Sequence, residues 1–343
     1  MVVPAYNAQR TICLCLEGLI NQTISPEAYE IIVVDDDSND GTREIIEKHG
    51  KVQLLRQPHR GPAAARNYGA QNASGEIILF IDADCVPAND WIERMIAPFG
   101  EMEIVGVKGT YLSHQTSLIA RFVQIEYEDK YKRMRRDKYI DFIDTYSAGY
   151  RRDIFLENDG FDTRFSVASV EDQEFSFRLA EQGYKMLFVP EAHVSHLGHA
   201  DNLKKYIAKK FKIGYWKVLV HIKHPDKLIR DSHTPQVLKL QILFAGLSVF
   251  FLVLGFVFQI SRWGLSLSLL VFFLTTLPFA WDAWKKDRWV ALLSPFLLFI
   301  RSIALGTGFA VGLIKNIILG VKGISQADQS TGKQAVNKAS KST

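Results

Sequence analysis

The sequence contains few cysteines and carries little net charge. Its 343 residues include only three cysteines, Cys13, Cys15 and Cys85, and none has the paired spacing of a zinc site. This scarcity is typical of a reduced domain that faces the cytosol. The net charge of +4, from 41 Lys and Arg against 37 Asp and Glu, is too small to indicate a nucleic-acid partner. A secretion signal is also absent, because Met1 is followed at once by a strand-like Val-Val-Pro and a turn.

Charge is nearly missing from a long stretch near the C-terminus, which we interpret as membrane segments. The runs 240–260 and 263–281 contain no central charge, and each is long enough to cross a hydrocarbon layer about 30 Å thick. Only Ser261 and Arg262 join them, so we expect a tight hairpin.

A third apolar run, 290–314, has Arg301 near its middle. Either Arg301 faces a polar partner, or the part up to Arg301 lies along the membrane interface and only the rest inserts. Lys285, Lys286 and Arg288 precede this run and predict the cytoplasmic side, which is then also the side of the catalytic domain.

These segments divide the chain into four parts. Residues 1–200 form one α/β domain, and 201–236 form a basic amphipathic helix with a linker, suited to a lipid headgroup layer. Residues 237–322 form the membrane part, and the polar tail 323–343 is expected to be disordered.

The first part alternates short apolar runs with helical patterns, which predicts a mostly parallel sheet flanked by helices. The expected strands are Val2–Val3, Ile31–Val34, Val52–Leu54, Ile77–Ile81, Ile104–Val107, Thr145–Tyr150 and Lys185–Val189. Ligands of such sheets bind at the carboxyl ends of the strands.

Two acidic clusters follow expected strands at that edge. Asp35 and Asp36 begin the first cluster, whose carboxylates can accept the N–H of uracil or guanine while the loop cradles the ribose. The second is Asp82-Ala83-Asp84, whose two carboxylates can reach one divalent ion. Hard oxygen ligands select Mg²⁺ or Mn²⁺, which bridge diphosphate oxygens.

Two further segments carry groups suited to the same chemistry. Arg60 and Gly61 open a stretch of small residues in which Arg66 can contact a diphosphate or hold a carboxylate. Glu171 and Asp172 open a later helix, where a carboxylate can take a proton from an acceptor hydroxyl or simply compensate the helix dipole.

Taken in order, the motifs of residues 1–200 resemble those of the family 2 glycosyltransferases. They are PAYN at Pro4–Asn7, VVDDDSNDGT at Val33–Thr42, RGPAAARNYG at Arg60–Gly69, FIDAD at Phe80–Asp84, GYRRDIF at Gly149–Phe155 and EDQEFSFRL at Glu171–Leu179. The resemblance implies a GT-A (Rossmann-like) fold, a nucleotide-sugar donor with UDP favoured over GDP, and inversion at the anomeric carbon.

The resemblance also implies a role for each matched residue. Pro4, Ala5, Tyr6 and Asn7 would line the nucleotide pocket, and Asp36, beside Asp35, would bind the base. Asp82, Ala83 and Asp84 would lie at the metal with Asp84 as the closer ligand, and His196 is a further metal candidate. Asp172 would be the general base and Glu171 its neighbour in the acceptor site.

The acceptor that these residues predict is a lipid-linked or membrane-proximal glycan. Alternatives are a polyprenyl-phosphate glycosyltransferase, an inactive membrane scaffold and a nucleotidyltransferase, although the chain has no glycine- and lysine-rich phosphate loop. A processive synthase is disfavoured, because the stretch Lys209–Trp216 reads KKFKIGYW instead of the QxxRW of that group.

Overall fold

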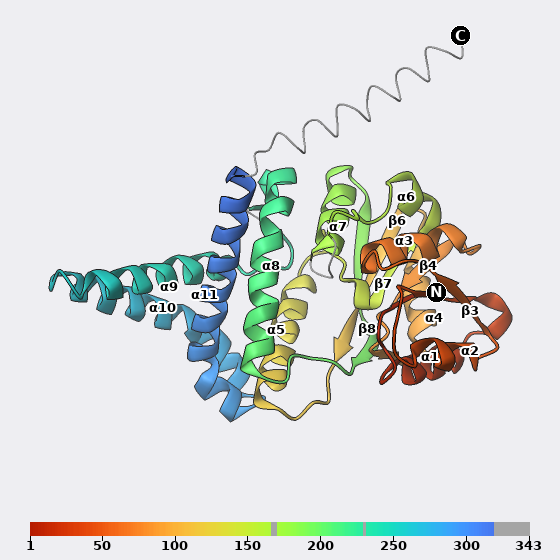
Figure 1. Cartoon of the computed structure of the whole chain (residues 1–343), viewed down its shortest axis with the longest axis horizontal. Helices are drawn as coiled ribbons and strands as arrows, with labels where there is room; N and C mark the ends of the chain where they lie inside the picture. Colours follow the sequence, from red (N-terminus) through yellow and green to blue (C-terminus); the bar gives the residue numbers. More distant parts are fainter. Residues whose placement is uncertain (166–169, 229–230, 319–343) are drawn as a thin grey trace, which may run out of the picture.

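The protein consists of a sheet domain and a helical arm (Figure 1). The computed structural model describes residues 1–165, 170–228 and 231–318, and the expected tail 323–343 lies outside these residues.

The sheet domain contains strands and helices that alternate in its first half. Its strands are β1 (Val2–Ala5), β2 (Ile31–Asp35), β3 (Val52–Arg56), β4 (Ile77–Phe80), β5 (Cys85–Pro87), β6 (Ile104–Leu112), β7 (Ala148–Arg151) and β8 (Lys185–His196). Its helices are α1 (Ile12–Ile20), α2 (Thr42–Glu47), α3 (Pro62–Asn72), α4 (Trp91–Ile96), α5 (Leu118–Met134), α6 (Arg152–Glu157) and α7 (Glu171–Glu181).

Within the described residues the strands form one eight-stranded sheet in the order β3-β2-β1-β4-β7-β6-β8-β5. The pairs β3–β2, β2–β1, β1–β4 and β6–β8 are parallel, whereas β7 runs antiparallel to both β4 and β6, and β5 runs antiparallel to β8. The predicted α/β sheet with flanking helices is confirmed, and the sheet is a mixed one.

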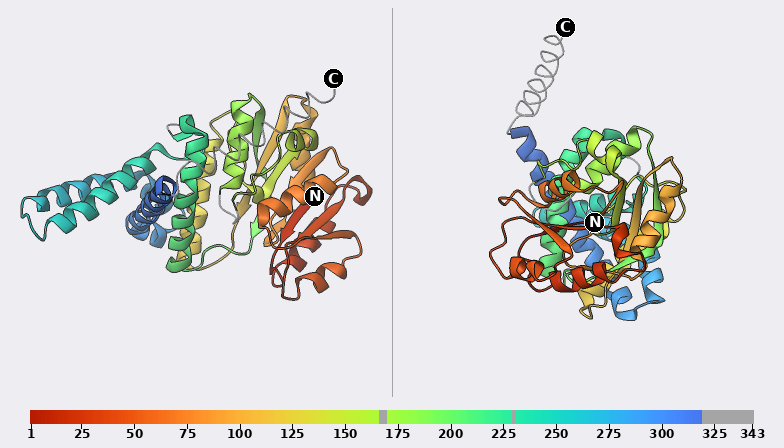
Figure 2. Two further views of the ribbon diagram at one scale, coloured as in Figure 1. Left: turned by 45° about the horizontal axis from the view of Figure 1, so that its top comes forward. Right: turned by 90° about the vertical axis from the view of Figure 1, so that its right-hand side faces the viewer.

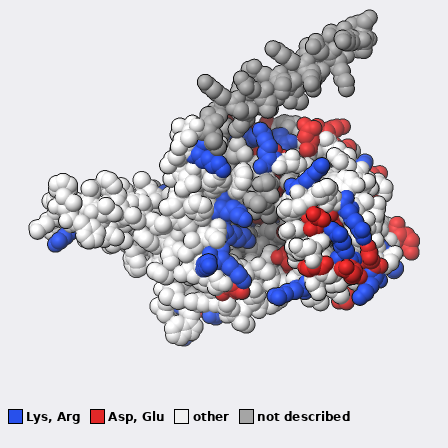
Figure 3. Space-filling model, in the orientation of Figure 1, with Lys and Arg blue, Asp and Glu red and all other residues white. Residues whose placement is uncertain are grey.

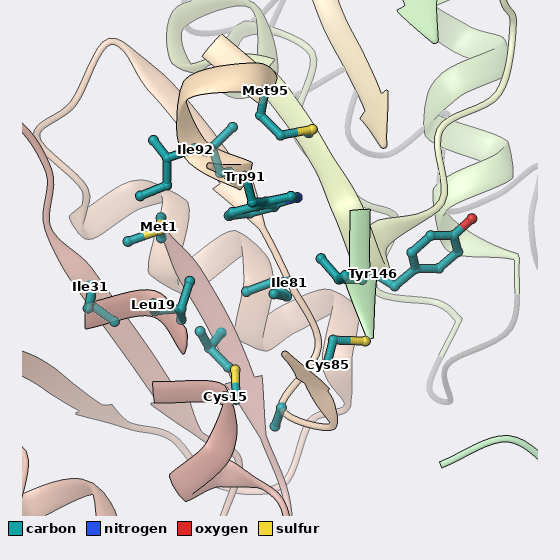
Figure 4. Close-up of a cluster of buried hydrophobic side chains, with 14 of the residues drawn as sticks. Met1, Cys15, Leu19, Ile31, Ile81, Cys85, Trp91, Ile92, Met95 and Tyr146 are labelled. Carbon is teal, nitrogen blue, oxygen red and sulfur yellow. The ribbon is translucent and has the colours of Figure 1, made fainter. Parts of the chain in front are cut away.

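Successive residues of the central strands pack into different cores, because strand side chains alternate between the two faces of a sheet. Val3 joins a cluster with α1 and α4, whereas Val2 joins a second cluster with α3, α6 and α7. Figure 4 shows the first cluster, in which Trp91 is fully buried and its indole Nε1–H donates to Ser147 Oγ at 2.9 Å. Burial on both faces holds the strand ends that carry the acidic clusters in a rigid frame.

The last strand is longer than its sequence pattern predicts. The apolar pattern ends at Val189, but β8 continues through Pro190 and Glu191 to His196. Pro190 has no N–H to offer a neighbouring strand, yet its carbonyl accepts from Thr110 Oγ1 at 3.0 Å and pairing with β6 resumes beyond it. His193 and His196 therefore lie within β8, beyond Val189, where the strand was expected to end.

The helical arm contains α8 (Leu203–Lys223), α9 (Gln236–Leu254), α10 (Ser261–Trp284) and α11 (Arg288–Ile318). In the described residues, α9, α10 and α11 are long and apolar enough to cross a membrane. Figure 1 shows α9 and α10 as a hairpin that projects away from the sheet domain, with α8 and α11 side by side at its base.

The connection between α9 and α10 is longer than expected. α9 ends at Leu254 and α10 begins at Ser261, so residues 255–260 form the turn that the sequence pattern assigned to Ser261 and Arg262 alone. The turn residues Phe256 and Ile260 are apolar and exposed, so hydropathy alone does not reveal where the helix stops.

A close approach of backbones joins α8 to α11. A Cβ atom added at Gly214 of α8 would lie 2.2 Å from the carbonyl oxygen of Leu305 in α11. Gly246 of α9 offers a contrast, because an added Cβ there would meet nothing within 4 Å.

We therefore expect Gly214→Ala to destabilise the protein and Gly246→Ala to leave it unchanged or slightly more stable. Overpacking at Gly214 should cost about 1–3 kcal/mol, whereas removing an exposed helical glycine gains up to about 1 kcal/mol. Thermal unfolding of both variants in the same detergent measures the difference. Equal melting temperatures for the two variants would contradict the close packing of α8 on α11.

Candidate active site

A pocket of about 710 Å³ lies at the carboxyl ends of β1 and β4, and we call it the strand-end pocket. It is lined by Pro4, Ala5, Tyr6, Asn7, Ala8, Gln9, Arg10, Thr11, Asp36, Asp40, His59, Pro62, Arg66, Asp82, Ala83, Asp84, His196 and Gly198. The PAYN turn, the two acidic clusters and His196 thus come together at the edge where open α/β sheets bind ligands.

Asp36 is buried in this pocket and organises the loop that precedes α3. Its Oδ1 accepts from the backbone N–H of Arg60 at 2.8 Å and from Gln57 Nε2 at 2.7 Å, and its Oδ2 accepts from the N–H of Gly61 at 2.9 Å. Arg60 and Gly61 therefore contribute their backbone N–H groups to Asp36, and neither residue itself lines the pocket. His59 Nδ1 also lies 2.9 Å from Asp36 Oδ2.

Asp35 does not line the pocket, although the sequence places it among the substrate-binding candidates. It is fully buried, accepts from the N–H of Ser38 at 3.2 Å and pairs with Arg43 Nε at 2.5 Å. Successive strand residues point to opposite faces, so Asp35 and Asp36 cannot both reach the same cleft.

An aromatic pair stands at the mouth of the pocket. The rings of Tyr6 and His59 lie 4.3 Å apart between centroids, and both side chains are exposed. Asn7 adopts a positive φ of 50°, and its Oδ1 accepts from the N–H of Asn39 at 2.9 Å. The turn that carries Tyr6 is therefore tied to the acidic loop across the cleft.

Arg66 lies at the floor of the site between two carboxylates. It is 2% exposed, its Nη2 lies 2.7 Å from Asp82 Oδ1, and its Nη1 lies 3.1 Å from Glu171 Oε1. Of the two roles that the sequence left open for Arg66, the structure supports the holding of carboxylates. Asp82 is thereby directed towards Arg66 rather than towards Asp84.

The residues best placed to hold a metal ion are Asp84 and His196. Asp84 Oδ2 lies 3.9 Å from His196 Nε2, and these atoms and the sulfur of Cys85 all lie within 4.8 Å of one another. The antiparallel pairing of β5 with β8 sets Cys85 opposite His196 and so brings the imidazole to the acidic motif.

The local chemistry fits a divalent cation. Burial lowers the pKa of His196, which keeps the ring in the neutral form that binds metals. Burial raises the pKa of the Cys85 thiol well above its usual range, so this group stays protonated and is a poor ligand. A Cβ on Gly198 would lie 2.7 Å from Asp84 Oδ2, and the glycine therefore leaves the space beside that oxygen open.

A second pocket, of about 320 Å³, adjoins the first, and we call it the helix-side pocket. Arg66, Asp82 and His196 line both pockets. From there the helix-side pocket extends past Glu171 and Asp172 to four lysines of α8, to Leu238 of α9 and to Phe279 of α10. The lysines are Lys209, Lys210, Lys212 and Lys217.

Asp172 is a partly buried carboxylate of this pocket, next to Glu171. Its Oδ1 accepts from the N–H of Gln173 at 2.8 Å, and its Oδ2 lies 3.4 Å from the N–H of Thr145. Burial and the charges of Glu171 and Asp144 raise the pKa of Asp172 well above its usual range. A carboxylate with a raised pKa beside a cleft is a stronger proton acceptor, as general-base catalysis requires.

Some residues of the site carry no recognisable signal in the sequence. His59 and Arg10 line the strand-end pocket, and only the neighbourhood of the RGPAAARNYG and PAYN motifs could have pointed to them. The amphipathic pattern of α8 predicts that its lysines contact lipid headgroups. Such a pattern does not reveal a cleft on one side of a helix, and four of the lysines line the helix-side pocket.

Comparison with known proteins agrees with this architecture. A model of the family "Glycosyl transferase family 2" matches residues 1–158. Glycosyltransferase AglE of Haloferax volcanii is 27% identical over 232 residues, which are 64% of this chain and 73% of that protein.

Another relative covers nearly the whole chain. The dolichyl N-acetyl-alpha-D-glucosaminyl phosphate 3-beta-D-2,3-diacetamido-2,3-dideoxy-beta-D-glucuronosyltransferase of Methanococcus voltae is 25% identical over 332 residues, 92% of this chain and 97% of its own length.

The fold also occurs in a solved structure. The mannosyltransferase PcManGT from Pyrobaculum calidifontis, in complex with GDP-Man and Mn²⁺, superposes with a TM-score of 0.58 at 18% identity and covers 92% of this chain and 86% of its own. The GT-A architecture, the ordered motifs and the family match lead to one assignment: residues 1–158 form a glycosyltransferase family 2 domain.

Proposed function

We propose that the protein transfers a sugar from a nucleoside-diphosphate sugar to an acceptor carried on a membrane lipid, with inversion at the anomeric carbon. One observation carries this proposal: two pockets meet at Arg66, Asp82 and His196, and one of them opens among helices that are apolar enough to enter a bilayer. A donor in the strand-end pocket and an acceptor in the helix-side pocket would then face each other across the candidate metal site.

In this proposal the strand-end pocket holds the donor. Tyr6 and His59 offer a stacking surface to the base, and Arg10, which is exposed and lines the pocket, can reach a diphosphate. Asp84 and His196 would hold Mg²⁺ or Mn²⁺, which neutralises the charge on the leaving nucleoside diphosphate. PcManGT, which shares the fold, was solved with a nucleotide sugar and Mn²⁺. We propose UDP as the nucleotide, with Asp36 at the base.

Asp172 is the proposed general base for an acceptor hydroxyl. It lies in the helix-side pocket beyond the Arg66–Glu171 pair, so it would approach the sugar from the acceptor side. A single base opposite the leaving group suffices for one in-line displacement, and this geometry inverts the anomeric carbon.

The helix-side pocket is the proposed acceptor site. Its wall includes Leu238, Phe279 and Leu305 from the three candidate spans, and the name of the Methanococcus voltae relative specifies a dolichyl-linked acceptor. Lys285 and Lys286 lie between α10 and α11 and Arg288 begins α11, and the positive-inside rule supports a cytoplasmic catalytic domain.

A second candidate function is transfer to a polyprenyl phosphate. The four α8 lysines in the helix-side pocket favour it, because they would attract an acceptor phosphate. Such an acceptor is already anionic and needs little help from a base, which separates the two candidates experimentally.

Asp84→Ala should abolish Mg²⁺- or Mn²⁺-dependent transfer, because it removes the only carboxylate in the Asp84–Cys85–His196 group of the described residues. Release of nucleotide from a panel of UDP- and GDP-sugars, with and without chelator, measures the effect. Asp226→Ala, at an exposed position outside both pockets, is the matched control. Full activity of Asp84→Ala in chelator would refute the metal role.

Asp172→Asn should lower transfer to a hydroxyl acceptor by about 10²–10⁴-fold, the usual contribution of a general base. The native enzyme should gain activity as pH rises, because Asp172 acts only after losing its proton. Since its pKa is raised, the half-maximal pH should lie above the ordinary Asp value of about 3.9. A pH–rate profile checks this, and an unchanged rate in the variant with a phosphate acceptor would favour the second candidate.

Asp36→Asn should raise the KM for the donor about tenfold or more, because charge-assisted hydrogen bonds to the turn before α3 are lost. Asp37→Asn is the matched control: Asp37 is exposed and has a φ of 67°, a conformation that asparagine tolerates well. Steady-state kinetics compare the two variants, and equal KM values would remove Asp36 from the donor site.

A further inference from the structure

The longest apolar helix of the arm, α11, is attached along its length, in its first half to the sheet domain and in its second half to α8. At its start, Arg121 of α5 pairs with Asp287 at 2.7 Å, just before the first residue of α11. At its middle, Arg301 Nη1 lies 2.9 Å from Glu126 Oε1, also on α5. A spanning helix would have to leave the domain after its first turns, and α11 does not.

The second half of α11 is attached to α8 instead. Cβ atoms added at Gly308 and Gly312 would lie 2.2 Å and 2.5 Å from the carbonyl oxygens of Phe211 and Tyr215. Lys315 Nζ lies 5.5 Å from the centre of the Tyr215 ring. Figure 1 shows α8 and α11 side by side, and both run across the direction of the α9–α10 hairpin.

α8 itself cannot cross a membrane, because it is too charged to enter hydrocarbon. It contains seven lysines: Lys204, Lys205, Lys209, Lys210, Lys212, Lys217 and Lys223. Each lysine at the centre of a bilayer costs about 2.5–3.5 kcal/mol on insertion scales. Figure 3 shows this basic row over α8, next to the hollow between the helix and the sheet domain.

The hairpin of α9 and α10 has the opposite character. It is almost free of Lys, Arg, Asp and Glu on the face shown in Figure 3, and it extends away from the domain. In the left view of Figure 2, α11 is seen nearly along its axis while the hairpin still lies lengthwise, so the two differ strongly in direction. α9 has 19 residues, about 28 Å at 1.5 Å per residue, which matches the hydrocarbon thickness.

The buried guanidinium of Arg301 fits the same arrangement. Its Nη2 lies 2.6 Å from Gln241 Oε1, near the start of α9, and Glu126 also pairs with Lys210 of α8 at 3.1 Å. This polar cluster marks the level at which the hairpin leaves the sheet domain. Arg301 therefore lies at the base of the hairpin and does not occupy the centre of a bilayer.

We propose that α9 and α10 alone cross the membrane and that α11 lies along its surface beside α8. The two helices form a platform that docks on a lipid layer with anionic headgroups. The outer residues of α11, among them Leu292, Phe296, Ile314 and Ile317, are exposed and apolar, and they enter the upper acyl region. Lys204 and Lys205 at the start of α8, which are exposed and lie outside the helix-side pocket, contact lipid phosphates. This topology is independent of the sugar, the nucleotide and the catalytic residues.

The proposal predicts that both ends of the chain lie on one side of the membrane. The test uses the full-length protein in sealed vesicles, with an epitope tag before Met1 in one form and after Thr343 in another. Both tags should be equally accessible to an added protease. If only one of the two tags is digested, α11 crosses the bilayer and the proposal fails. Neither tag alters a described residue, and nucleotide release by each form shows that it is folded.

Depth measurements provide a second test. In a Cys13→Ser background, where Cys15 and Cys85 are fully buried, single cysteines replace Phe296, Ile314 and Leu270 and carry a spin label. Labels at 296 and 314 should lie at the same shallow depth, and the label at 270, midway along α10, should lie deep. Labels at 296 and 314 in opposite leaflets would overturn the proposal.

Discussion

The ion pairs of one buried guanidinium, that of Arg66, connect the parts of the candidate active site. Arg66 is held by α3, and its two carboxylate partners come from the end of β4 and from the start of α7, far apart in the chain. Removing one member of such a buried set leaves an uncompensated charge, which typically costs about 3–5 kcal/mol. The guanidinium therefore sets how the strand-end pocket and the helix-side pocket meet, and Asp82 takes its direction from it.

The candidate metal site depends on a different constraint, the pairing of two strand segments of unequal length. β5 has three residues and directly follows the acidic motif, and it pairs antiparallel with the end of β8. That register places His196 beside Cys85 and close to Asp84. A neutral imidazole and a carboxylate become neighbours because the sheet continues past Pro190, where the sequence pattern suggests that it stops.

The membrane arm and the catalytic domain are coupled through buried polar contacts as well as apolar packing. Glu126 of α5 pairs with Arg301 of α11 and with Lys210 of α8, and Lys210 also lines the helix-side pocket. The wall of the proposed acceptor pocket is therefore built by the same helices that we place at the bilayer surface. An acceptor anchored in the membrane would meet the pocket without leaving its lipid layer.

Much of the catalytic domain could be predicted from the sequence, because its signals are local. Apolar runs between turn residues predicted most strands, and the acidic motifs at strand ends predicted the edge where Asp36 and Asp84 now share a pocket. The lack of charge in the runs 240–260 and 263–281 predicted a hairpin, since hydropathy is a property of each segment by itself.

Tertiary structure alone decided the features that depend on long-range pairing. Asp35 and Asp36 are adjacent in the sequence, but the pleat of β2 sends one to Arg43 and the other to the pocket. The sequence did not predict the role of His59, the strand β5 or the extension of β8 to His196, because the partners of these segments are distant in the chain. The same holds for α11: its composition suits a membrane crossing, whereas its glycines hold it against a lysine-rich helix, a contact that no local pattern encodes.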